Sequence, residues 1–122
     1  MGILQTFVKT VDDKITLYKR QENLPRWAEM CGVEDYEQID MTNPYVRLEF
    51  LLCDVGILRS LSGGKGRDAF LKILSPEEQD IYLNTVDEDG ARYTDLEDPK
   101  VMKDLQAKIK QARKEAKKQK KR

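Results

Sequence analysis

The chain has 122 residues, with 22 Lys or Arg and 22 Asp or Glu, so its formal net charge is zero. Charged residues make up 36% of the sequence, against about 25% in an average domain. There is no His, and there are two cysteines, Cys31 and Cys53. These counts exclude catalytic triads, Cys–His pairs, His metal sites and a disulfide framework, and the length suits one domain.

Residues 2–21 show the spacing of an amphipathic helix. Their apolar side chains lie three or four positions apart and form one stripe: Leu4, Phe7, Val8, Val11, Ile15 and Tyr18. Thr10, with Asp13 three residues later, offers a competing start, so two helical pieces are the alternative. Pro25 predicts the start of a short helix over 26–31, because proline fits the first turn of a helix, and Gly32 predicts its end.

The acidic residues 33–43 predict a connecting loop. Asn43 followed by Pro44 is a strong start signal, because Asn caps a helix and Pro fits its first position. The apolar residues that follow nearly encircle a helix, which predicts a buried central helix over 44–62. Gly56 inside this helix predicts the close approach of a neighbouring element.

The glycine-rich residues 62–66 predict a flexible turn, and 67–74 predict a short helix. Ser75-Pro76-Glu77-Glu78 then forms a capping box, which predicts a helix to about Val86. Residues 87–98 are predominantly acidic and predict a loop.

Asp98-Pro99 repeats the cap-and-proline signal, and from there a helix is expected to run to the end of the chain. Its apolar residues are spaced 3, 4, 3 and 4 apart, as in a heptad seam: Met102, Leu105, Ile109, Ala112 and Ala116. Because the seam weakens from large side chains to Ala, we expect its first turns to dock on a body or partner and its last turns to project into water. The sequence predicts an all-α bundle of about five helices with a long basic C-terminal helix.

The neutral total is the sum of two opposite charges. Residues 98–122 hold 11 basic and 3 acidic side chains, a net charge of +8, and residues 1–97 hold 11 basic and 19 acidic ones, a net charge of −8. We therefore divide the chain into an acidic helical body, 1–97, and a basic helix and tail, 98–122. This asymmetry predicts that the tail meets an anion.

Nucleic acid is the first candidate for that anion, because basic side chains that neutralise phosphates release counterions. The tail contains no aromatic residue, so binding is expected to be salt-sensitive and blind to sequence. An acidic protein surface, including the chain's own body, and a purely solubilising tail are the alternatives. The candidate binding residues are Lys108, Lys110, Arg113, Lys114, Lys117, Lys118, Lys120, Lys121 and Arg122.

Two further hypotheses remain open. In the first, the chain is an interaction module, such as an assembly factor, inhibitor or subunit, that docks through the seam over 98–116. Its expected partner contacts are Met102, Leu105, Ile109 and the single tryptophan, Trp27. In the second, Met1-Gly2 opens a pattern for N-myristoylation, and the basic tail would be the second signal of a peripheral membrane protein.

The sequence predicts a binding protein that is not an enzyme. It suggests no cofactor and no metal site, since the residue types that dominate such sites are missing. Without a recognisable signal peptide or transmembrane stretch, we expect an intracellular protein, cytoplasmic or, in a eukaryote, nuclear.

Overall fold

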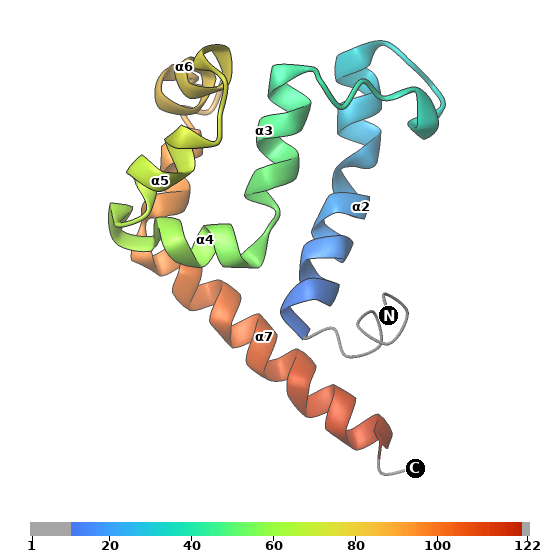
Figure 1. Ribbon diagram of the computed structural model, residues 1–122. Coiled ribbons are helices and arrows are strands. Elements are labelled where there is room, and N and C mark those ends of the chain that lie inside the picture. Colours follow the sequence, from blue (N-terminus) through green and yellow to red (C-terminus); the bar gives the residue numbers. More distant parts are fainter. Residues whose placement is uncertain (1–10, 121–122) are drawn as a thin grey trace.

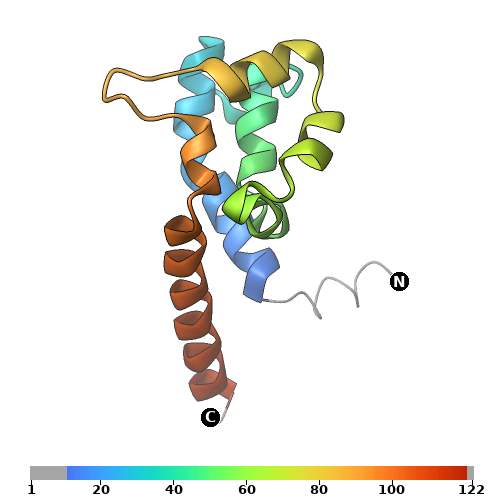
Figure 2. The ribbon, with the colours of Figure 1, turned by 90° about the vertical axis from the view of Figure 1, so that its left-hand side faces the viewer.

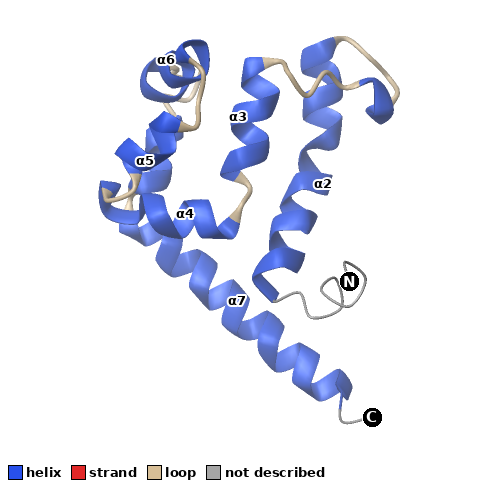
Figure 3. Cartoon of the chain, viewed as in Figure 1, coloured by secondary structure: helices blue, strands red, loops and turns tan. Residues whose placement is uncertain are grey.

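The computed structural model describes residues 11–120, and the side chains of residues 11–118. Figure 1 shows the chain from end to end, and Figure 3 shows that the described part consists of helices and loops. Besides an isolated antiparallel bridge between Val86 and Arg92, this part contains no β structure. The predicted small all-α fold is confirmed. Its elements are α2 (Val11–Cys31), η1 (Tyr36–Gln38), α3 (Pro44–Leu52), α4 (Val55–Leu61), η2 (Ser62–Gly64), α5 (Arg67–Lys72), α6 (Pro76–Asn84), η3 (Tyr93–Glu97) and α7 (Pro99–Lys120).

The arrangement places α2 and α3 side by side, and α4 turns across the lower end of α3 (Figure 1). The short helices α5 and α6 fold back against α3, and α6 lies next to it. Helix α7 crosses the body near the start of α2 and then extends beyond the other described helices, as Figures 1 and 2 both show. None of the helices within residues 11–120 combines the length and the apolar character that a bilayer span requires.

The prediction of a new helix at Pro25 is wrong, because α2 runs without interruption from Val11 to Cys31 with Pro25 inside it. An interior proline costs about 3 kcal/mol in a helix. That cost is offset by packing, since the next turn buries Trp27 and Ala28 against α3 and the segment before it. The first part of the predicted N-terminal helix, residues 2–10, lies outside the described residues.

The predicted central helix over 44–62 is also wrong, because it consists of two helices with a break at Asp54. The Asp54 carboxylate accepts a hydrogen bond from the backbone N–H of Ile57 at 3.1 Å and caps α4. The N–H of Val55 donates to the Thr16 hydroxyl of α2 at 3.0 Å. Both helices contribute to the central cluster, while Val46 of α3 enters a second cluster and Val55 and Leu58 of α4 enter a third.

The expectation for Gly56 is wrong as well. Gly56 is exposed, and a Cβ built there would meet the capping Oδ1 of Asp54 at 3.0 Å instead of a neighbouring helix. The close approach occurs at Gly66, where a Cβ would lie 1.9 Å from the hydroxyl and 2.5 Å from the carbonyl oxygen of Ser60. Gly66 therefore lets the turn after α4 fold back onto that helix.

Two local start signals are confirmed. Asn43 accepts hydrogen bonds from the N–H groups of Tyr45 and Val46 and caps α3. Ser75 and Glu78 form the full capping box of α6, although this helix ends at Asn84 and not at Val86. The interval predicted as an acidic loop, 87–98, differs from the prediction because it contains the helical turn η3.

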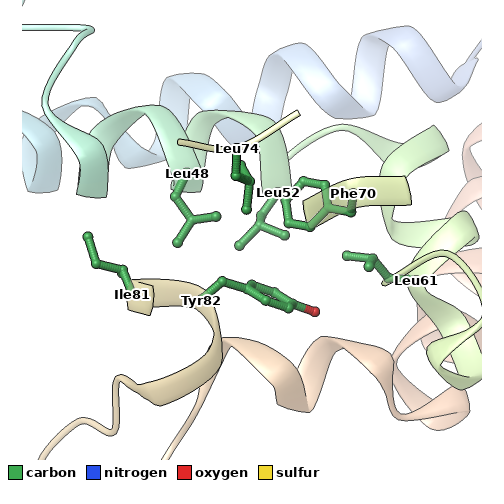
Figure 4. Packing of buried hydrophobic residues seen from close by; sticks show 7 residues of the cluster. All are labelled: Leu48, Leu52, Leu61, Phe70, Leu74, Ile81 and Tyr82. Atoms are coloured by element: carbon green, nitrogen blue, oxygen red, sulfur yellow. The ribbon is translucent and has the colours of Figure 1, made fainter. Parts of the chain in front are cut away.

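The core consists of three apolar clusters. The central cluster lies between α3, α4, α5 and α6 and is drawn in Figure 4: Leu48, Leu52, Leu61, Phe70, Leu74, Ile81 and Tyr82. In it the rings of Phe70 and Tyr82 meet edge to face with centroids 5.3 Å apart, a favourable geometry for aromatic pairs. A second cluster surrounds Trp27, and the third joins α4 to α7.

Candidate nucleic-acid interface

The inner face of α7 belongs to the core of this chain. Met102, Leu105 and Ile109 are 8%, 8% and 1% exposed, and they pack with Val55 and Leu58 of α4. The start of α2 covers the same cluster through partly buried apolar side chains. This corrects the expectation that these three side chains face a partner, because the chain's own helices already occupy the seam.

Trp27 is also buried inside the chain. Its predicted role as a partner contact is therefore wrong. The side chain is 1% exposed, and its ring packs beside Phe50 with centroids 6.1 Å apart. Its indole N–H donates to Oε1 of Glu49 at 3.0 Å. Trp27 therefore closes the cluster between α2 and α3.

The outer side of α7 carries a basic flank. Residues spaced seven, four and three apart lie on one side of an α-helix, and lysines occupy four such positions: Lys103, Lys110, Lys114 and Lys117. All four are exposed. The acidic residues of α7, Asp104 and Glu115, lie by the same geometry on the opposite flank. At 1.5 Å per residue, the basic flank is about 21 Å long.

The other predicted tail cations lie on different sides of α7 or outside the described residues. Lys108 is exposed on the flank that also carries Glu115, and Lys118 is exposed on the face opposite the core. Arg113 points toward the body, where its Nη2 lies 3.7 Å from Oδ1 of Asp12. The side chain of Lys120, together with Lys121 and Arg122, falls outside the described residues. The Gly2 pattern for N-myristoylation also falls outside them.

Asp12 connects this helix to the body through two arginines. Its Oδ2 lies 2.8 Å from Nη2 of Arg59 on α4, while Arg113 of α7 approaches Oδ1. The three helices α2, α4 and α7 therefore meet at one carboxylate. The burial of Met102, Leu105 and Ile109 sets the rotation of α7 about its axis, and with it the direction in which the basic flank points.

The charges of the molecule are separated in space as well as in sequence. The acidic loops around η1 and between α6 and η3 lie at the end of the body opposite the C-terminal half of α7 (Figures 1 and 2). Their exposed carboxylates include Glu34, Asp35, Glu37, Asp40, Asp87, Glu88 and Asp89. A polyanion would be repelled at one end of the molecule and attracted at the other.

Sequence reasoning missed a buried carboxylate, Glu49, in the middle of α3. It accepts two hydrogen bonds from Arg26 at 3.0 Å each, one from Trp27 and one from the hydroxyl of Tyr93 at 2.6 Å. Burial alone would raise the pKa of Glu49, but the hydrogen bonds from Arg26, Tyr93 and Trp27 outweigh it and hold the pKa below its usual range. A charged residue within an apolar helix was the available signal, since a buried carboxylate needs partners.

Glu97 at the end of η3 forms a second cluster of the same kind. Hydrogen bonds from Arg67 hold the pKa of Glu97 below its usual range against the opposing effect of burial, and the Tyr82 hydroxyl contributes at 2.6 Å. Burial, together with the neighbouring carboxylate, raises the pKa of Tyr82. Glu97 was assigned to an exposed acidic loop by its composition, but it is 7% exposed.

The three buried carboxylates hold segments of the fold together. Glu78, the third, pairs with Arg47 of α3 while it caps α6. Each of the three thus joins two segments and is engaged by donors of the protein itself. Burial also raises the pKa of the Cys53 thiol, which disfavours its nucleophilic thiolate form. Within residues 11–120 no three His, Cys, Asp or Glu side chains gather in a way that could hold a metal ion.

Comparisons with protein-family models, with curated proteins and with solved structures give no match to this chain.

Proposed function

We propose that this protein is a non-enzymatic, nucleic-acid-binding protein that contacts the phosphate backbone through the basic flank of α7. The observation that carries the proposal is the row of Lys103, Lys110, Lys114 and Lys117 along one flank of a helix whose inner face is anchored in the core as far as Ile109. Because all four lysines belong to one helix, they share a common backbone and do not need to be ordered separately on binding.

The dimensions of the flank suit a nucleic-acid strand. Phosphates follow one another at about 3.4 Å along one strand, so a flank of about 21 Å lies beside roughly six phosphates. The lysines are spread over this whole length, so the flank suits an extended polyanion better than a single anionic group.

The same flank supports binding that does not depend on base sequence. Lysine ammonium groups contact phosphates as point charges, and residues 98–122 hold no aromatic side chain to stack on a base. The contacts position the nucleic acid without reading it.

The test is the binding of a fluorescently labelled duplex of arbitrary sequence by the full chain, measured by anisotropy at several salt concentrations. In the flank variant, Lys110, Lys114 and Lys117 are replaced by Gln. If each lysine neutralises one phosphate, the slope of log K against log salt decreases by about 2.7, since each contact contributes about 0.9. The matched control replaces Lys65, Lys72 and Arg92, three exposed cations of the body, by Gln and changes the net charge equally.

The proposal predicts a large loss of affinity in the flank variant and a small one in the control. Equal losses in the two variants would reduce the effect to net charge and contradict the proposal. Binding of a polyglutamate chain but not of the duplex would instead identify an acidic protein partner. Removing residues 108–122 is not a suitable test, because Ile109 is part of the core.

A further inference from the structure

A groove runs between the start of α2 and the second half of α7. Its apolar lining comes from Val11, Ile15 and Tyr18 of α2 and from Ala112 and Ala116 of α7, and its volume is about 280 Å³. Lys14 and Glu115 contribute one charge of each sign. We call it the α2–α7 groove.

The groove lies where the apolar seam of α7 leaves the core. Ile109 is buried, whereas Ala112 is half-buried and Ala116, one turn further, is exposed. On the other side Tyr18 is 61% exposed. Within the described residues, the apolar stripe of α2 and the seam of α7 thus continue past the point where other helices cover them.

We propose that residues 1–10 of this chain occupy the α2–α7 groove. This segment is joined directly to Val11, which lines the groove, and the C-terminal half of α7 extends beyond the start of α2 on that side (Figures 1 and 2). The proposal goes beyond nucleic-acid binding and does not depend on it.

The composition of the segment fits the lining of the groove. Five of its residues are large and apolar, and its one charged side chain is Lys9. Leu4, Phe7 and Val8 stand seven, four and three positions before Val11, so they extend the stripe that Val11 and Ile15 begin. Exposing apolar side chains to water is unfavourable, so docking of this segment in the groove would remove the apolar surface of both from solvent.

The length of the segment is sufficient. Along α7, the stretch from Ile109 to Ala116 covers about 10 Å, and ten residues reach about 15 Å even as a helix. A segment tethered to the rim of the groove also has a high effective concentration there, which a separate partner lacks. Docking would cover the inner side of residues 112–118 and would leave the basic flank free on the outer side.

The test measures amide hydrogen exchange in the full chain. Replacing Leu4 and Phe7 by Ser is expected to raise exchange in residues 112–118 about tenfold, a factor that corresponds to about 1.4 kcal/mol. The matched control replaces Gln5 and Lys9, which lie between the stripe positions, by Ser and is expected to leave exchange unchanged. Unchanged exchange in both variants would overturn the proposal.

A second experiment changes the lining of the groove instead of the N-terminal segment. Ala116→Asp places a carboxylate at its lining and is expected to raise exchange in residues 3–9, whereas Ala107→Asp, an exposed position of α7 away from the groove, is expected to have no such effect. Sedimentation over a range of concentrations identifies a different occupant. If protection of 112–118 disappears on dilution together with a dimer, a second copy covers the groove and the proposal is wrong.

Discussion

Tyr93 of η3 donates its hydroxyl to the buried carboxylate of Glu49 in α3 at 2.6 Å, across 44 residues of sequence. Four residues later, Glu97 at the end of the same turn accepts the hydroxyl of Tyr82 in α6 and the guanidinium of Arg67. These contacts fix η3 at both ends. Since α7 begins directly after η3, they also determine where α7 leaves the body.

Removing the hydroxyl of Tyr93 is expected to destabilise the protein. In Tyr93→Phe the Glu49 carboxylate loses a donor while it remains buried, which costs about 1.5–3 kcal/mol for a hydrogen bond to a charged group. Urea unfolding followed by the fluorescence of Trp27 measures the loss. The control, Tyr45→Phe at a position that is 42% exposed, is expected to stay within about 0.5 kcal/mol of the parent chain.

The stability of the fold is expected to fall in mild acid. The pKa values of Glu49 and Glu97 are lowered in the folded chain, while glutamates of the unfolded chain titrate near about 4.3. The stabilising contribution of these two carboxylates is therefore complete above a pH of about 4.3. It is lost as the pH falls from there through the folded pKa values, because the unfolded chain takes up protons first.

Urea unfolding at a series of pH values between about 6 and 3 brackets this window. Arg67→Gln removes the chief cause of the lowered pKa of Glu97, and Glu97→Gln removes the titrating group itself. Both variants are expected to lose stability less steeply with acid than the parent chain. An identical slope in all three chains would show that Glu97 does not contribute to the acid sensitivity.

The seam residues of α7 are expected to contribute to the stability of the chain as core residues do. Ile109→Ala leaves a cavity among α4, α2 and α7 and is expected to cost about 2–5 kcal/mol of unfolding free energy. The exposed neighbour Lys110→Ala is the control, with an effect within about 0.5 kcal/mol. If Ile109→Ala left the isolated chain as stable as its parent but abolished a complex, the seam would belong to a partner interface after all.

Gly66 is expected to tolerate no side chain. A Cβ at this position would lie 2.5 Å from the backbone oxygen of Ser60, so Gly66→Ala forces the turn away from α4 and weakens the hydrogen bond from the Gly66 N–H to that oxygen. Thermal unfolding followed by circular dichroism is expected to show a larger loss than in Gly90→Ala. Gly90 has a φ of 82°, but an added Cβ there meets nothing within 4 Å.

The all-α class and the separation of charge follow from the amino-acid sequence alone. The sequence also located the helix starts at Asn43 and Ser75, because a cap is formed by a side chain and backbone groups two or three residues away. All groups that form such a cap lie within a few residues of one another, so the cap can be predicted without knowing the tertiary structure.

Which of the local signals take effect depends on long-range packing. The helix continues through the start signal at Pro25, where Trp27 packs against α3. The apolar run over 44–62 is divided at Asp54, and its residues enter all three clusters. The partners of Glu49 and Glu97 lie between 15 and 44 residues away, beyond the reach of periodicity. The same long-range packing determined that the seam of α7 faces inward, and therefore that its lysines form the outer flank.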